Sequence, residues 1–277
     1  MAVSRPVVSR RREVGGGSAR SLLTTVLGEF VLPHGKPVWT ATLVDVLALF
    51  GVEEKAARQA LARTAAEGWL SSDRVGRRVR WSLTRPGRRL LAEGAARIYG
   101  FGSGERPWDG RWLVLLVSVP ETMRDLRHKL RTRLSWAGFG SPTAGVWITP
   151  HPEAEADAKL ILDELDLSAM SFLANYGALG QELDMVASAW NLTEVAEHYD
   201  AFIAEFADLT PDTPDAVLRA QTLLVHEWRR FPFLDPQLPA ELLPPKWSGT
   251  TATTLFNDKH VRWRAPAQDR WTELATV

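Results

Sequence analysis

The sequence predicts an α+β protein of several domains, because three stretches of the chain carry different hydrophobic patterns. Residues 40–84 have the pattern of two short helices followed by a β-hairpin. Residues 111–173 alternate between apolar strands and amphipathic helices, and residues 190–277 are mostly helical with many prolines. A chain of 277 residues is long enough for two or three such domains, each with its own core.

The first stretch has the spacing of two helices joined by a tight turn. We predict that Thr40 is the N-cap of the first helix and that Gly51 ends it. The second helix is expected from about Glu53 to Glu67, with Gly68 as its stop. Small residues form its inward face, and a stripe at helical spacing faces outward. That stripe consists of Lys55, Arg58, Gln59, Ala62 and Arg63.

A hairpin rich in arginine follows the second helix. Its strands are predicted at residues 69–71 and 75–83, with the turn at Asp73 to Gly76. Two helices and a basic hairpin are typical of a winged helix-turn-helix, whose second helix enters a major groove while the hairpin lies against phosphates. The alternative is a solvated amphipathic helix beside an ordinary hairpin. The predicted DNA-binding residues are Lys55, Arg58, Gln59, Arg63, Arg77, Arg78 and Arg80.

The charge distribution favours DNA binding by the N-terminal part. Residues 1–100 carry 17 Lys+Arg against 8 Asp+Glu, a net charge of +9. Residues 101–150 carry 7 against 4, a net charge of +3, and residues 151–277 carry 9 against 21, a net charge of −12. A basic module joined to an acidic half suits a protein of which only one part should contact DNA.

Helices are predicted on both sides of this motif, at residues 19–32 and 85–99. Ser18 or Ser21 is the expected cap of the first, and Thr84 caps the second, with Pro86 in its first turn. We therefore predict a disordered basic tail at residues 1–19, a winged helix-turn-helix domain at 20–100 and a linker at 100–107.

The middle of the chain alternates strands and helices. Strands are predicted at residues 111–119, 145–149 and 170–173, with helices at 122–136 and 153–165. Met123, Leu126, Leu130 and Leu134 are the expected inward side chains of the first of these helices. This order indicates a ferredoxin-like domain at residues 105–187. A mostly helical C-terminal domain is predicted at residues 188–277, with helices at 191–206, 214–229 and 250–263.

Composition excludes several classes of site. There is no cysteine, which excludes disulfides, thiolate metal sites and cysteine nucleophiles and fits a reducing cytoplasm. No stretch approaches the roughly 20 apolar residues of a membrane span, and Ser9-Arg10-Arg11-Arg12 is not followed by the apolar run of an export signal. We expect a soluble, cytoplasmic protein with no membrane partner.

The stretch Leu224–Gly249 reads LVHEWRRFPFLDPQLPAELLPPKWSG and closely resembles the signature of the PaaX family, bacterial repressors of phenylacetic acid catabolism and their relatives. Shorter matching segments occur in the family's order at residues 119–121, 138–140, 145–150 and 189–192. The resemblance implies a homodimeric DNA-binding repressor with winged-helix, ferredoxin-like and helical domains. It also implies an aryl-CoA thioester as inducer.

No motif for catalysis or metal binding is present. The middle domain also resembles the metal-dependent nucleases of CRISPR adaptation, which need an Asp at the end of the first strand to hold a divalent cation. Here that strand ends at Val117-Ser118-Val119-Pro120, without an acid before Glu121. His226-Glu227 lacks the second His of a zinc-protease motif. We predict no enzyme activity, no catalytic residue, no metal and no cofactor.

Two arginine clusters are candidates for binding the phosphates of a CoA-type ligand, which Arg grips in a bidentate manner. They are Arg124, Arg127 and Arg131 in the predicted helix 122–136, and Arg229 with Arg230. Solvated charge or a loose contact with DNA is the alternative for the first cluster. The second function class we consider is a CoA-thioester-handling enzyme or sensor without specific DNA binding. We expect the middle and C-terminal domains to supply the dimer contacts, so that deleting residues 105–277 leaves a monomer.

Overall fold

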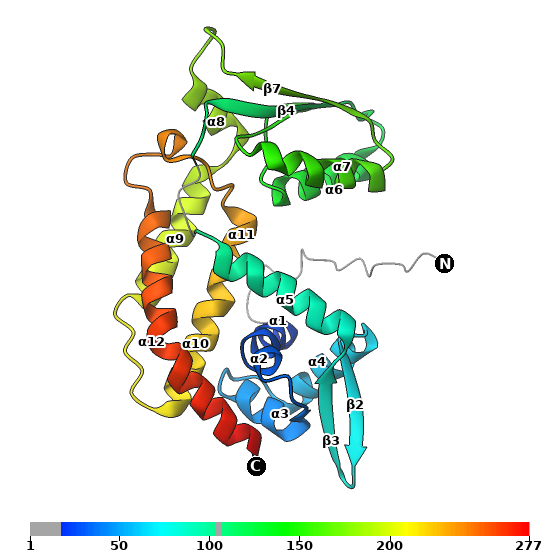
Figure 1. The fold of residues 1–277 in the computed structure, drawn as a ribbon, viewed down its shortest axis with the longest axis vertical. Coiled ribbons are helices and arrows are strands. Elements are labelled where there is room, and N and C mark those ends of the chain that lie inside the picture. The colour runs from blue at the N-terminus through cyan, green and yellow to red at the C-terminus, as the bar shows by residue number, and fades with distance from the viewer. Residues whose placement is uncertain (1–17, 103–106, 277) are drawn as a thin grey trace. The chain divides into compact units, whose positions relative to one another are not determined.

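The computed structural model describes residues 18–102 and 107–276 (Figure 1). Helices and two antiparallel sheets make up the chain, as expected for an α+β protein. They form two compact units, one of residues up to 101 with 205–230 and 254 onward, the other of residues 102–204 and 231–253. Residues 188–277 thus contribute to both units. Most of the predicted tail, residues 1–17, and residues 103–106 of the predicted linker lie outside the described residues.

The first unit begins with one continuous helical segment of three parts. These are α1 (Ala19–Val26), the π-helical turn η2 (Leu27–Val31) and α2 (Leu32–His34). Ser18 caps α1, because its side chain accepts a hydrogen bond from the Ser21 N–H. Gly35 ends the segment with φ +63°, a conformation that glycine adopts without steric cost. The sequence pattern predicts the helix and its cap, but not the π-helical turn.

The two helices predicted to form a helix-turn-helix are α3 (Thr40–Ala48) and α4 (Glu54–Ala66). The prediction that Thr40 is an N-cap is wrong, since Trp39 occupies that position. The Thr40 hydroxyl instead donates to the Val79 carbonyl at 3.0 Å and accepts from Trp81 Nε1 at 2.9 Å. These partners lie in the sheet, so Thr40 ties the start of α3 to the hairpin.

Three strands follow the order β1-β3-β2 in an antiparallel sheet. They are β1 (Val38–Trp39), which the pattern did not predict, β2 (Leu70–Val75) and β3 (Arg78–Leu83). The predicted turn at Asp73 to Gly76 is wrong. Asp73 pairs with Arg80 inside the ladder, and the chain reverses at Gly76 and Arg77, where Gly76 has φ +62°.

Three long helices complete this unit: α5 (Arg85–Gly100), α10 (Pro214–Trp228) and the last part of α12 (Ser248–Thr276). Thr84 caps α5 as predicted, by accepting from the Gly87 N–H. The hydrophobic core joins α1, α3 and α4 to Leu218 of α10 and to Trp271 of α12. The helices from the end of the chain are therefore part of the same core as α3 and α4.

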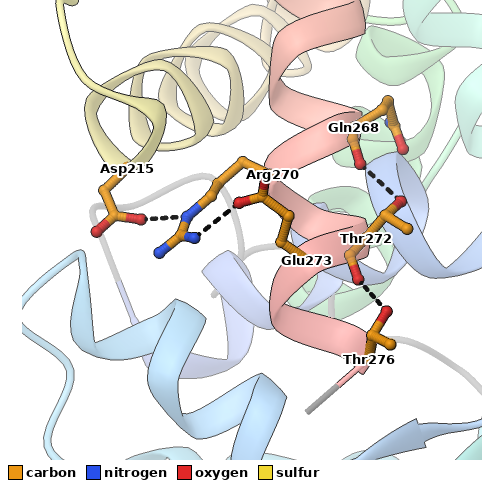
Figure 2. A network of polar contacts seen from close by, with 6 residues as sticks. All are labelled: Asp215, Gln268, Arg270, Thr272, Glu273 and Thr276. Atoms are coloured by element: carbon orange, nitrogen blue, oxygen red, sulfur yellow. Dashed lines mark hydrogen bonds and ion pairs between the residues drawn. The ribbon is translucent and has the colours of Figure 1, made fainter.

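The last helix is much longer than predicted. We expected it at residues 250–263, but it continues through Pro266 to Thr276. Figure 2 shows how its end is held. Arg270 Nε donates to Asp215 of α10 at 2.7 Å, and Arg270 Nη1 donates to Glu273 at 2.9 Å. The Thr272 hydroxyl donates to the Gln268 carbonyl at 2.9 Å, and that of Thr276 to the Thr272 carbonyl at 2.6 Å.

The second unit contains a four-stranded antiparallel sheet of order β5-β6-β4-β7. Its elements are β4 (Arg111–Val117), α6 (Arg124–Trp136), β5 (Gly140–Thr143), β6 (Val146–Thr149), η3 (Pro152–Ala154), α7 (Glu155–Glu164) and β7 (Ala169–Asn175). Strand β5 was not predicted. The helices α6 and α7 cover one face of the sheet, and β7 forms its edge (Figure 1). Met123 was predicted to face inward, but it precedes α6 and is 51% exposed.

The other face of this sheet packs against α8 (Glu182–Ala189) and the start of α9 (Leu192–Phe206). The segment that resembles the family signature continues through α11 (Phe231–Leu234) and η4 (Ala240–Leu242). Asp235 accepts hydrogen bonds from the Tyr199 hydroxyl and the Gln237 N–H, each at 2.6 Å. His151 Nε2 lies 3.0 Å from the Gln237 carbonyl oxygen. Asp235 and Gln237 of the signature therefore connect it to α9 and to the segment after β6 within the second unit.

Candidate nucleic-acid interface

Helix α4 separates a buried face from an exposed one. Ala57, Ala60, Leu61 and Thr64 are buried against the core that includes α1 and α3. The residues predicted to contact DNA all lie on the opposite, exposed side: Lys55, Arg58, Gln59 and Arg63. The alternation follows the 3.6-residue period of the helix, which is why the sequence was sufficient to separate the two faces.

Two arginines of the predicted interface are held by carboxylates. Arg58 Nη2 lies 2.7 Å from Glu54 Oε1 in the same helix, and Arg80 Nη2 lies 2.6 Å from Asp73 Oδ2 across the hairpin. Both pairs are more than two-fifths exposed, so they contribute little to stability. Their effect is to fix where the two guanidinium groups point.

The hairpin presents further arginines. Arg77 lies in the turn and Arg78 follows it, and both are exposed. The Arg78 guanidinium lies over the Trp39 ring, 4.3 Å from its centroid. Arg74, which we did not single out, is also exposed in β2, and its Nε donates to the Gly76 carbonyl at 3.2 Å. The sequence could have indicated Arg74 only if β2 had been predicted to extend beyond Ser71.

The two arginine clusters predicted to bind a ligand lie in different units. Arg124, Arg127 and Arg131 are exposed on α6 in the second unit. Arg229 and Arg230 belong to the first unit, where both have intramolecular partners. Arg229 Nη2 donates to the Ser21 hydroxyl at 2.5 Å, and Arg230 Nη1 lies 2.8 Å from Glu227.

The described part of the chain shows neither a metal-binding group of side chains nor a membrane-spanning helix. Within residues 18–102 and 107–276, no group of three or more His, Asp or Glu side chains is arranged to hold a metal ion. Among the same residues, no helix is both long and apolar enough to cross a membrane.

Comparison with known proteins gives the same family for three successive segments of the chain. Residues 18–87 match the family described as PaaX-like protein, residues 105–186 the PaaX protein central Cas2-like domain, and residues 190–273 the PaaX-like protein C-terminal domain. The Transcriptional repressor PaaX of Escherichia coli (strain K12) is 33% identical over 254 residues, covering 86% of this chain and 78% of the relative.

A solved structure has the same fold. The uncharacterized protein Rv0674 from Mycobacterium tuberculosis superposes with a TM-score of 0.61 at 22% sequence identity, over 91% of this chain and 98% of that one. At this level of identity the likeness concerns the fold alone. The matching segments and the relative in E. coli show that the chain belongs to the PaaX family.

Proposed function

We propose that the protein is a DNA-binding transcriptional repressor. The observation that carries the proposal is the exposed basic face of α4, followed directly by an arginine-rich hairpin on the same core. The relative in E. coli is named a transcriptional repressor. In this proposal α3, α4 and the sheet β1-β3-β2 are a winged helix-turn-helix, with α4 in the major groove and the hairpin along the phosphates.

Substitutions in the two elements should have different effects on DNA binding. Arg58→Ala is expected to weaken operator binding by about 1–3 kcal/mol and to relax base preference, if Arg58 reads a guanine edge. Arg80→Ala should weaken binding to all sequences alike and reduce the slope of log K against log salt by about 1. Fluorescence anisotropy with a duplex from upstream of the protein's own gene, at several salt concentrations, measures both.

The control for this experiment is Arg262→Ala, which removes an exposed arginine from α12. Its binding should equal that of the unchanged protein. If the double variant Arg58→Ala/Arg80→Ala keeps full operator affinity at moderate salt, the winged-helix assignment is wrong. If the unchanged protein shows no specific DNA binding while it binds CoA thioesters, the alternative of a thioester-handling enzyme or sensor is favoured.

The middle sheet supports a ferredoxin-like domain in a homodimer. Its connectivity is strand–helix–strand–strand–helix–strand, and its order β5-β6-β4-β7 is that of the ferredoxin-like fold. The edge strand β7 contains no charged residue, and Phe172 within it is 50% exposed. Such an unprotected apolar edge can pair with a second copy about a two-fold axis. A two-fold dimer presents two reading helices, so the operator should be an inverted repeat.

We expect Phe172→Arg to shift the protein from dimer to monomer in sedimentation, because a charge at the centre of the edge opposes pairing of like strands. Leu160→Arg is the matched control, since Leu160 is an exposed apolar residue of α7. It should leave the dimer intact. A dimer that persists in Phe172→Arg would place the interface elsewhere.

An aryl-CoA thioester is the proposed inducer, and α6 is the favoured place for its phosphates. Arg124, Arg127 and Arg131 make no ion pair with the described residues, whereas Arg230 is paired with Glu227. A ligand releases a repressor only if it binds the free form better than the DNA-bound form. Calorimetry with phenylacetyl-CoA, against free CoA and the free acid, tests this. If no thioester binds below about millimolar, an affinity of roughly −4 kcal/mol, the inducer class is wrong.

A further inference from the structure

The pair Glu54–Arg58 has a geometry suited to more than helix stability. Glu54 is the first residue of α4, and Arg58 follows it by one turn. Arg58 Nε donates to Glu54 Oε1 at 2.7 Å, and Arg58 Nη2 lies 2.7 Å from the same oxygen. One carboxylate oxygen therefore holds one edge of the guanidinium group. The side chains of Arg58 and Glu54 remain 56% and 63% exposed.

The opposite edge of the guanidinium is left for another partner. A guanidinium has five N–H donors in a rigid plane, and the contact with Glu54 uses the edge formed by Nε and Nη2. The end formed by Nη1 and the second N–H of Nη2 still offers two parallel donors. Two parallel donors are what the O6 and N7 atoms of guanine accept in the major groove.

Glu54 is also expected to affect binding to DNA that lacks the right base. An arginine held in place loses less rotamer freedom when it binds than a freely rotating one does. The carboxylate repels phosphates, so it weakens contacts that depend on charge alone. A carboxylate in this place should lower non-specific affinity while it favours the sequence that Arg58 can read.

We propose that Glu54 is a positioning residue that sets base specificity by directing Arg58 end-on at a guanine in each half-site. This inference rests on the proposed DNA-binding function. It differs from that function in assigning a reading role to an acidic residue that makes no attractive contact with phosphates.

The test compares base preferences of variants of the full-length protein. Each protein selects duplexes from a random-sequence pool, and the selected sites and a non-specific duplex are then measured by anisotropy. Glu54→Ala should lose about tenfold in discrimination at one base pair per half-site, the same base pair at which Arg58→Ala loses its preference. Its affinity for the non-specific duplex should rise a few-fold, since one repelling charge is gone.

Three further variants separate positioning from charge. Glu53→Ala removes a neighbouring exposed carboxylate that does not cap the helix with its side chain, so it should raise non-specific affinity without changing base preference. Glu54→Gln keeps an acceptor oxygen and should recover part of the discrimination. Glu93→Ala breaks a pair of the same spacing in α5, Arg89–Glu93, and should leave base preference unchanged.

Two outcomes would overturn the inference. One is that Glu54→Ala changes affinity equally for all sequences, as Glu53→Ala does. The other is that the double variant Glu54→Ala/Arg58→Ala loses more discrimination than Arg58→Ala, which would mean that Glu54 acts without Arg58. If the unchanged protein selects no sequence from the pool, the proposed function fails instead. Thermal melts of each variant confirm that it is folded.

Discussion

Trp271→Ala is expected to lower the free energy of unfolding by about 3–5 kcal/mol, the usual cost of removing a large aromatic side chain from a core. Trp271 lies near the end of α12 and is buried. Its ring stacks on that of Phe30, with centroids 5.3 Å apart and an angle of 18° between the planes. It belongs to the same core as α3 and α4, so the variant should also bind DNA less well at temperatures near its melting point.

Urea unfolding followed by circular dichroism measures the change in the free energy of unfolding of Trp271→Ala. The matched control is Val261→Ala in the same helix, because Val261 is 78% exposed. That change should stay within about 0.5 kcal/mol of the unchanged protein. If Trp271→Ala is as mild as Val261→Ala, the end of α12 does not contribute to the core of the first unit.

The same packing changes what is expected of a truncated protein. From the sequence, deleting residues 105–277 should leave a monomer that binds a full operator poorly. The structure gives a reason to expect that the fragment is also unstable, because the deletion removes Leu218, Ala267 and Trp271 from the core. It also removes His226, whose Nδ1 lies 2.9 Å from the Thr25 hydroxyl oxygen. We now expect the fragment to lack a cooperative unfolding transition.

Local periodicity predicted α3 and α4 because the spacing of apolar residues within each helix is a local signal. The second helix was expected at about Glu53 to Glu67 and is found at Glu54–Ala66, with its buried and exposed faces as the spacing indicates. Thr40 shows the limit of such signals. A Thr before an apolar helical run is a strong cap signal, but here a contact with Val79 and Trp81 across the sheet decides its position.

Contacts between distant parts of the chain could not be predicted in this way. Nothing in the spacing of residues 214–276 indicates that α10 and α12 join the core of α1, α3 and α4, and the helix predicted at residues 250–263 continues past Pro266. The candidate site shows the same limit. Arg229 and Arg230 are predicted from the sequence to bind phosphates, but the contact of Arg229 with Ser21, more than 200 residues away, has no local signal.

Several contacts between distant parts of the chain meet at Glu29. It is a buried carboxylate in the π-helical turn η2. Its Oε1 accepts from Gln221 Nε2 at 2.8 Å, and its Oε2 accepts from the Tyr99 hydroxyl. His260 Nε2 lies 3.7 Å from Oε1, and Gln268 Nε2 donates to the backbone carbonyl of Glu29 at 2.8 Å. Partners from α5, α10 and α12 thus meet at one side chain.

Burial opposes the charge of Glu29, but these donors stabilise it more. Burial alone would raise the pKa of Glu29, whereas interactions with His260, Tyr99 and Gln221 hold the pKa below its ordinary value of 4.5. The native state therefore binds a proton at Glu29 less readily than the unfolded state does. Stability from Glu29 is present above about pH 4.5 and is lost as the pH falls below that value.

As the pH falls, His226 begins to destabilise the native state at a higher pH than Glu29 does. Burial, with Arg229 and Arg230 nearby, lowers the pKa of His226 from 6.5 to about 4. Between these values the unfolded state binds the proton and the native state does not, so stability falls as the pH drops from 6.5 towards 4. The acid profile of the protein should have two parts, the first from His226 and the second from Glu29.

Glu29→Leu is expected to lower the free energy of unfolding at pH 7 by about 3–5 kcal/mol, because it leaves the buried amide of Gln221 and the hydroxyl of Tyr99 without their acceptor. Tyr99→Phe should cost less, about 1–2 kcal/mol, since the carboxylate keeps its other donors. Urea midpoints between pH 7 and pH 3 measure both the cost and the profile. In Glu29→Leu the fall below pH 4.5 should flatten, while the fall between pH 6.5 and 4 remains because His226 is unchanged. A variant that keeps the complete acid profile of the unchanged protein would show that Glu29 is not ionised in the core.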